Sequence, residues 1–294
     1  MELRQLRYFV AVAEERSFSR AARRVHISQP PLSRQVALLE QRLDVQLLNR
    51  TTHEVSLTKA GEAFLAEARQ LLSLSAKAGE VARRASRGET GRIRIGFIGA
   101  ALYSFLPRLL REYRQRYPDV EISLSQLTIA QQGEALVNRE IDVGVIRQHL
   151  ADDALQTWCV LKEPFVVALP LDHPLARREK VMLKSLAREP FVFFNRRDAP
   201  VVYDQTLRIC EHAGFSPHIV QEARPMATVI GLVAAGLGVS IVPTSMQRIN
   251  IEHVAYRPLS GTRAVNEFVI AWHREHRSPV LDRFLAMAKE VPQA

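Results

Sequence analysis

The residues whose types and spacing suit recognition chemistry lie in the segment 17–43, close to the N-terminus. Apolar residues recur there at helical spacing and predict one buried stripe, made of Leu32, Val36, Leu39 and Leu43. At about 100° per residue the opposite face carries Pro30, Arg34, Ala37 and Gln41, with Gln29 and Ser33 on its flank. Arginine pairs with guanine and glutamine with adenine through two hydrogen bonds, so this face suits the major groove of DNA.

A shorter helix is predicted just before this one. Its apolar face comprises Phe18, Ala21, Ala22 and Val25, and Ser17 stands where a serine side chain caps a helix. Ser28 is a second candidate cap, and Pro30 and Pro31 fall in the first turn of the following helix, where a missing N–H does little harm. The alternative is an ordinary helical hairpin whose polar face only meets water, because such hairpins are common.

The flanking segments predict a small domain around this hairpin. An amphipathic helix precedes it, with an apolar face of Leu3, Leu6, Phe9, Val10 and Ala13. After Asp44, the segments 45–48 and 54–57 predict a β-hairpin with a basic polar tip. Three helices followed by a hairpin form a winged helix-turn-helix, whose tip can reach phosphates or a minor groove.

A long helix is predicted next, from a Thr58 cap to about Arg87. Its small and apolar residues recur in steps of three and four: Phe64, Leu65, Ala68, Leu71, Leu72, Ser75, Ala78, Ala82 and Ala85. A seam of this kind is typical of a coiled coil, so we expect the helix to pair two chains. A helix that lies across its own domain is the alternative.

Beyond Gly88 the pattern changes to alternating strands and helices. Strands are predicted at 93–97, 120–124, 141–146, 165–169, 191–194, 218–221 and 239–242, and helices at 130–138, 201–212, 226–235 and 244–250, after a first helix that starts near Leu106. Such alternation predicts parallel sheets with crossover helices. The length favours two lobes, with chain crossings near 160–164 and 263–269.

The charge is unevenly distributed along the chain. Residues 1–88 carry 15 Lys and Arg against 9 Asp and Glu, whereas the remaining 206 residues carry 25 against 22. The basic N-terminal third predicts a polyanionic partner, although a basic surface can also serve solubility alone. No apolar run approaches the roughly 18 residues of a membrane span, and the charged N-terminus lacks the pattern of a signal peptide, so we expect a cytoplasmic protein without membrane contact.

No pattern in the sequence predicts catalysis, a metal or a cofactor. Cys159 and Cys210 lie far apart and lack the spacing of a metal site or a redox pair. Neither glycine cluster, at 96 and 99 or at 236 and 238, completes a dinucleotide fingerprint. His273 and His276 lie in a charged turn with Glu275 between them and no cysteine nearby in the sequence, so we expect no metal site, no cofactor and no enzyme.

A ligand site is predicted from the geometry of open α/β sheets, which bind ligands beyond the carboxyl ends of their strands. The residues placed there are Gly99, Ala100, Thr128, Ile129, Arg147, Asn195 and Tyr203, together with Thr228 if the helix at 226–228 faces the cleft. Arg147 directly follows a buried run, where it would either clamp a carboxylate or form a structural ion pair. We expect a small anion, an aromatic or unsaturated carboxylate, to bind between the lobes.

The whole chain resembles the LysR-type transcriptional regulators. The likeness rests on LRYFVAVAEERSFSRAARRVHISQPPLSRQVALLEQRLDVQLLNR and LTKAG in the first part, and on IDVGVIR and GLVAAGLGVSIVP in the second. The first part looks most like the branch that controls catabolism of aromatic compounds. The resemblance implies a mainly α winged helix-turn-helix at 1–58, a linker helix at 59–88 and a two-lobed α/β effector domain of the periplasmic-binding-protein type at 89–294. Lobe I would comprise about 91–161 and 268–294, and lobe II about 162–267.

The resemblance also implies partners and contact residues. Ser28, Gln29, Pro30, Ser33 and Arg34 would contact double-stranded DNA at a promoter, with Arg50 and His53 on the backbone. Many relatives carry Arg where this chain has His53, and a hydroxyl residue where it has Ala100. Members are typically homotetramers built as dimers of dimers, and a contact with RNA polymerase is compatible with this.

Two other classes of protein were weighed against this interpretation. A solute-binding protein would need a secretory signal and would leave residues 1–88 unexplained. A cytoplasmic α/β enzyme with an appended helical domain would need a catalytic constellation.

Overall fold

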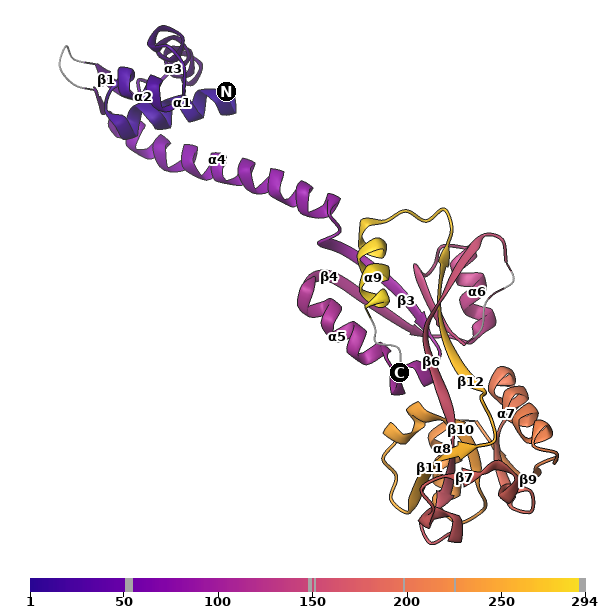
Figure 1. The fold of residues 1–294 in the computed structure, drawn as a ribbon. Helices are drawn as coiled ribbons and strands as arrows, with labels where there is room; N and C mark the ends of the chain where they lie inside the picture. The colour runs from indigo at the N-terminus through magenta and orange to yellow at the C-terminus, as the bar shows by residue number, and fades with distance from the viewer. Residues whose placement is uncertain (51–54, 148–149, 151, 198, 225, 291–294) are drawn as a thin grey trace. The chain divides into compact units, whose positions relative to one another are not determined.

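Three helices form the N-terminal part of the chain: α1 (Leu3–Glu15), α2 (Phe18–Arg24) and α3 (Gln29–Leu43) (Figure 1). The structure, a computed structural model, describes residues 1–50, 55–147, 150, 152–197, 199–224 and 226–290. The chain divides into two units, Met1–Arg84 and Ala85–Ala294. The predicted domain limits at residues 58 and 88 remain predictions.

The core of the first unit contains the apolar stripe predicted for α3. Leu32, Val36 and Leu39 are fully buried, and Leu43 packs against the same cluster. The predicted cap of α2 is confirmed, because the Ser17 hydroxyl accepts a hydrogen bond from the backbone N–H of Arg20. Ser28 occupies the cap position of α3, but its side chain makes no capping hydrogen bond.

The wing consists of two short antiparallel strands, β1 (Leu48–Arg50) and β2 (Val55–Leu57). The first strand was expected at 45–48, and this expectation is wrong. The backbone N–H groups of Leu47 and Leu48 both donate to Glu40 Oε1, at 2.9 and 3.0 Å. This carboxylate holds the segment against α3, so strand pairing begins only at Leu48.

The long predicted helix is present as α4 (Lys59–Ser86). Thr58 caps it, since its hydroxyl accepts a hydrogen bond from Gly61 N–H at 2.9 Å. Gly61 has no room for a side chain, because a Cβ there would lie 2.0 Å from the carbonyl oxygen of Leu47. The first half of α4 packs on the three helices through Phe64, Leu65, Ala68 and Leu72.

The second unit is built on one eight-stranded sheet with the order β4-β3-β5-β12-β6-β11-β7, and β10 also pairs with β6. These strands are β3 (Thr90–Phe97), β4 (Asp119–Gln126), β5 (Val143–Ile146), β6 (Leu155–Pro170), β7 (Val181–Met182), β10 (Ser240–Pro243), β11 (Val254–Ser260) and β12 (Val265–His273). A separate parallel pair consists of β8 (Pro190–Phe194) and β9 (His218–Ala223).

The expectation of purely parallel sheets is wrong. Strand β3 runs parallel to β4 and β5, but β12 is antiparallel to both β5 and β6. Both β10 and β11 are antiparallel to β6 as well. The alternation of strands and helices predicts only crossover units, whereas β6 and β12 pair antiparallel although about a hundred residues separate them in the chain.

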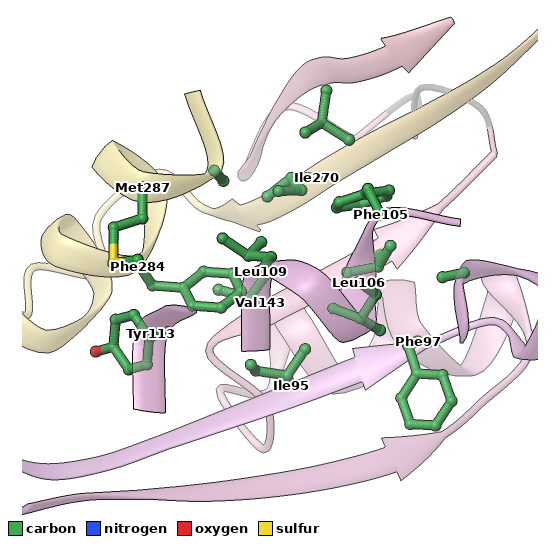
Figure 2. Packing of buried hydrophobic residues seen from close by; sticks show 14 of the residues in the cluster. Ile95, Phe97, Phe105, Leu106, Leu109, Tyr113, Val143, Ile270, Phe284 and Met287 are labelled. Carbon is green, nitrogen blue, oxygen red and sulfur yellow. The ribbon is translucent and has the colours of Figure 1, made fainter. Parts of the chain in front are cut away.

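Two lobes surround separate cores in this unit. In the first, α5 (Leu106–Arg116) and α9 (Pro279–Lys289) pack together, with the rings of Tyr113 and Phe284 5.3 Å apart between their centroids (Figure 2). The helix α6 (Ile129–Val137) packs on a neighbouring cluster. In the second lobe, α7 (Pro200–His212) and α8 (Met226–Ala234) cover β8.

The chain crosses between the lobes in β6 and β12. Strand β6 includes the predicted crossing segment 160–164, and β12 includes the part of the segment 263–269 from Val265 onward. The described residues of this unit also form four short 3-10 helices: η1 (Gly99–Tyr103), η2 (Pro174–Arg177), η3 (Leu183–Leu186) and η4 (Thr244–Arg248). The longer helix expected at 244–250 is therefore wrong. Met246 within η4 and Ile249 directly after it are both buried in a core cluster of the second lobe.

Candidate DNA-reading and effector sites

The outward face of α3 is open and carries one cation among polar residues. Gln29, Pro30 and Arg34 are exposed and Ser33 is half-buried. Among the described residues, the Arg34 guanidinium has no hydrogen bond or ion pair, so its donors are free for a ligand. The predicted face is thus present in the first unit.

Buried contacts hold α3 in place behind this face. The amide of Gln5, which is almost fully buried, donates from Nε2 to Gln35 Oε1 at 3.2 Å and joins α1 to α3. An unpaired buried amide would be costly, so this bond favours one position of α3. At the N-terminal end, the Ser19 hydroxyl of α2 donates to Gln29 Oε1 at 2.7 Å. Ser19 was not among the predicted residues.

Arg50 and His53 are the DNA contacts predicted in the wing. Arg50 is the last residue of β1, and only its backbone is described. His53 lies outside the described residues. The contacts predicted for both residues therefore remain predictions.

Arg147 directly follows β5 and is the most unusual charged residue of the second unit. It is 6% exposed, and its guanidinium carbon lies 5.5 Å from the centroid of the Phe268 ring. Nη2 donates to the Met226 sulfur at 3.8 Å, and Nε has no hydrogen-bond partner among the described residues. Burial, which disfavours the charged form, lowers the pKa of Arg147 to about 10, against an opposing effect of Glu163. The side chain therefore keeps its charge at neutral pH.

The alternative role of Arg147 in a structural ion pair has no support in the described part of the chain. No described carboxylate oxygen lies within 4.0 Å of its guanidinium. The charge of Glu163 raises the pKa of Arg147, but Glu163 is itself buried and its carboxylate accepts hydrogen bonds from other groups. Glu163 accepts from Ser245 N–H at 2.7 Å, Ser245 Oγ at 3.0 Å and Asn266 Nδ2 at 2.8 Å. A weak thioether acceptor and an aromatic face thus take the place of a carboxylate.

The Glu163 cluster joins both crossing strands to η4. Glu163 lies on β6, Asn266 on β12 and Ser245 on η4. None of the three was predicted, although Glu163 and Asn266 fall within the predicted crossing segments. In the sequence Glu163 stands between Lys162 and Pro164, and Asn266 between Val265 and Glu267, so no local pattern marks either residue as buried.

The other predicted effector residues of the first lobe serve mainly local structure. Ala100 is buried in the core, and Gly99 begins η1 beside the side chain of Gln126. Thr128 is exposed and caps α6 in a capping box with Gln131. Ile129 packs against the cluster around Ile146 and Leu136.

The predicted residues of the second lobe are similarly placed. Asn195 donates from Nδ2 to Glu222 Oε2 at 3.0 Å. Tyr203 packs edge-to-face on Phe193, with 5.2 Å between ring centroids, and Arg196 lies over its ring at 5.7 Å. Thr228 is exposed in the first turn of α8, two residues after Met226. Met226, within the predicted segment 226–228, thus contacts Arg147 from this lobe. Phe268, whose ring lies beside the same guanidinium, was not predicted.

Two surface cavities lie elsewhere in the second unit. One of about 830 Å³ runs between α5 and β4 and is lined by Leu110, Arg111, Arg114, Gln115, Pro118, Val120, Ile122 and Leu124. The other, of about 330 Å³, is lined by Arg177, Arg178, Glu179, Tyr256, Arg257 and Pro258. Neither includes a residue of the predicted effector site.

The described residues contain no group of three or more His, Cys, Asp and Glu side chains placed to hold a metal ion. Within the same part of the chain, no helix is long and apolar enough to cross a membrane. Cys210 is buried, which raises the pKa of its thiol to about 12, and such a thiol is unreactive.

Both units of the chain match known protein families. Residues 3–62 match the bacterial regulatory helix-turn-helix proteins of the lysR family, and residues 86–293 match the LysR substrate binding domain. The chain is 41% identical to the HTH-type transcriptional regulator AlsR of Bacillus subtilis (strain 168) over 285 residues, which are 97% of this chain and 94% of AlsR.

Solved structures agree with this match. Full-length CbnR in complex with its target DNA superposes with a TM-score of 0.85 at 32% identity, over 99% of each chain. The effector-binding domain of BenM with its effector benzoate superposes with a TM-score of 0.63 at 29% identity, over 68% of this chain and 91% of that domain. The chain therefore belongs to the LysR family of transcriptional regulators, which are not enzymes, and it combines a winged helix-turn-helix with a two-lobed α/β effector-binding domain.

Proposed function

We propose that this regulator responds to a small organic carboxylate that binds the Arg147 guanidinium between the two lobes. The observation that carries the proposal is a buried arginine without an anionic partner among the described residues. Burial of a charge is costly unless an opposite charge and hydrogen bonds compensate it. A bound carboxylate supplies both, because it accepts two parallel hydrogen bonds from one guanidinium.

The surroundings of Arg147 favour a carboxylate attached to an apolar, flat group. Phe268 presents its ring to the guanidinium, and Met226 presents a thioether. These groups would contact an aromatic ring or an unsaturated chain, whereas a strongly hydrated anion such as phosphate would lose its water without compensation. BenM, whose effector-binding domain was solved with benzoate, supports this class of ligand.

Met226 provides the link between ligand binding and the lobes. It packs against the core of the first lobe and against that of the second. A carboxylate oxygen is a stronger acceptor than the thioether and would replace it at Nη2. Displacement of Met226 would alter packing in both lobes, so the ligand would favour one lobe arrangement through its differential affinity.

On the DNA side, α3 would enter the major groove of a promoter. Gln29, Pro30, Ser33 and Arg34 would contact the bases, Ser28 would lie at the helix start, and Arg50 and His53 would approach the backbone. The open guanidinium of Arg34 and the basic first unit support this assignment. The complex of CbnR with its target DNA supports it as well.

Assembly into a dimer of dimers belongs to the same proposal. Leu71, Leu74 and Val81 lie in the middle and second half of α4 and are exposed, which suits pairing with another α4. In the effector-binding domain, β4 is an edge strand next to the 830 Å³ groove, and Leu124 at its end is exposed. A second effector domain would cover this edge.

An Arg147→Met substitution tests the proposal. It keeps bulk and removes the charge, so the affinity for benzoate and for related unsaturated carboxylates should fall about 10- to 100-fold, as expected for hydrogen bonds to a charged group. Calorimetric titration measures this, and DNA binding by anisotropy should be unchanged without ligand. Arg108→Met, at an exposed arginine paired with Glu112, is the control. Equal affinity of the Arg147→Met and unmodified proteins would refute the role of Arg147.

A further inference from the structure

The hydrogen bond between Ser19 and Gln29 joins the two helices of the DNA-reading hairpin at their exposed edge. Ser19 lies in α2 and Gln29 is the first residue of α3. The hydroxyl donates to Oε1 of the amide at 2.7 Å, a typical distance for such a bond. Both side chains are exposed, so the bond contributes little to the stability of the fold.

The backbone around this bond is firmly placed. Ala21 and Ala22 of α2 and Leu32 of α3 are buried in one cluster. The turn is closed by a hydrogen bond from Ile27 N–H to Ala22 C=O at 3.0 Å. The distance between positions 19 and 29 is therefore set by the packed hairpin and not by the two side chains themselves.

The terminal amide of glutamine has two ends of nearly equal size and opposite hydrogen-bonding character. One end accepts and the other donates, and an exposed amide exchanges them by rotation at little cost. Each base pair presents donors and acceptors in a fixed order along the major groove. An amide that is free to rotate can therefore fit two different orders, whereas an amide held in one orientation fits only one.

We propose that Ser19 determines DNA sequence specificity by fixing the orientation of the Gln29 amide. The hydroxyl holds Oε1 on the side of α2 through one lone pair, so Nε2 lies on the far side. The second lone pair of Oε1 and the two N–H groups then meet the base edge in one order. This inference rests on the proposed entry of α3 into the major groove.

The test is a binding selection on a random double-stranded DNA library with the full-length protein, followed by affinities for single-base variants of the selected site. Ser19→Ala should reduce the base preference at the one position read by Gln29 by about two- to tenfold, the value of one hydrogen bond. Preferences at the other positions should not change. Ser19→Thr keeps the hydroxyl and should retain the preference.

Other outcomes would overturn the inference in distinguishable ways. If Ser19→Ala weakens binding equally on all sequences, the hydroxyl contacts a phosphate and does not fix the amide. If Ser19→Ala changes nothing, or if Ser19→Thr loses as much preference as Ser19→Ala, the orientation role is wrong. Gln29→Met separates this from the proposed function, because an unchanged selected site in that variant would show that Gln29 reads no base.

Discussion

Two arginines show that the environment of a residue decides which ligand its side chain can contact. Arg34 and Arg147 are both isolated cations in apolar stretches of sequence. Arg34 lies on an exposed helical face, whereas Arg147 is buried against Phe268 and Met226. The first can meet the bases of DNA without loss of existing contacts, and the second offers its charge only to a ligand that enters the protein.

At this scale we expect Arg34→Ala to reduce discrimination between an operator and random DNA by about 5- to 150-fold. Loss of a bidentate contact with a base costs about 1–3 kcal/mol at that position. Footprinting and anisotropy at fixed salt measure the effect, and circular dichroism checks the fold. Arg108→Ala removes one charge from the other unit and serves as the control. An unchanged footprint and affinity in Arg34→Ala would contradict the assignment of the reading face.

At the scale of elements, Glu14 joins three helices of the first unit. Its carboxylate meets Arg24 of α2 and Arg69 of α4, each with a shortest N–O distance of 2.7 Å. Glu15 of the same helix adds contacts with Arg20 and Arg24. The start of α4 is thus tied to α1 by charge as well as by the T-shaped contact of Phe9 with Phe64.

This network predicts a pH-dependent stability. The hydrogen bond from Arg69, followed by that from Arg24, lowers the pKa of Glu14 below its ordinary value of 4.5, against the effect of burial. A depressed pKa means that the stabilisation is complete above 4.5 and is lost as the pH falls through the folded-state value. Glu14→Gln should therefore lower the free energy of unfolding of the first unit at pH 7, by about 0.2–1 kcal/mol for exposed ion pairs, and by less in acid.

Amide hydrogen exchange of α1 and α2 in the full-length protein, at several pH values, measures this difference. Glu67→Gln is a suitable control, because Glu67 is an exposed acidic residue of α4 for which no ion pair is described. A destabilisation by Glu14→Gln that is the same at pH 7 and in acid would show that the carboxylate acts through packing and not through charge.

At the scale of the whole molecule, the surface of α4 bears on assembly. The sequence predicts a seam that includes both Leu71 and Leu72. The structure divides this pair, because Leu72 packs against the core of the first unit while Leu71 is 39% exposed. Leu74 and Val81, at 63% and 52% exposed, continue the outward face one heptad apart. The seam available to a second chain therefore passes through Leu71, Leu74 and Val81.

Glutamate at positions 74 and 81 should disrupt this pairing. Leu74→Glu with Val81→Glu would bury unpaired charges in the seam, so the assembled mass should fall by light scattering and operator affinity should fall with it. Ala76→Glu, on the opposite side of the helix, should leave the mass unchanged. A monomeric unmodified protein, or a doubly substituted protein of unchanged mass, would contradict pairing through α4.

The first unit follows closely from local sequence. Its helices are specified by contacts between residues three or four apart, such as Leu32 with Val36, and by caps within one turn, such as Ser17 and Thr58. Interactions this short in sequence can be inferred from spacing and residue type alone. The strand start at Leu48 escaped prediction because it depends on Glu40, eight residues away.

The second unit depended on contacts between distant segments. The antiparallel pairing of β6 with β12 joins residues about a hundred positions apart, as in Glu163 with Asn266, and no local pattern specifies such a partner. The environment of Arg147 is of the same kind, since Met226 and Phe268 reach it from two other elements. Spacing along the chain identified the arginine, but only tertiary packing decided that its guanidinium is buried without a described carboxylate beside it.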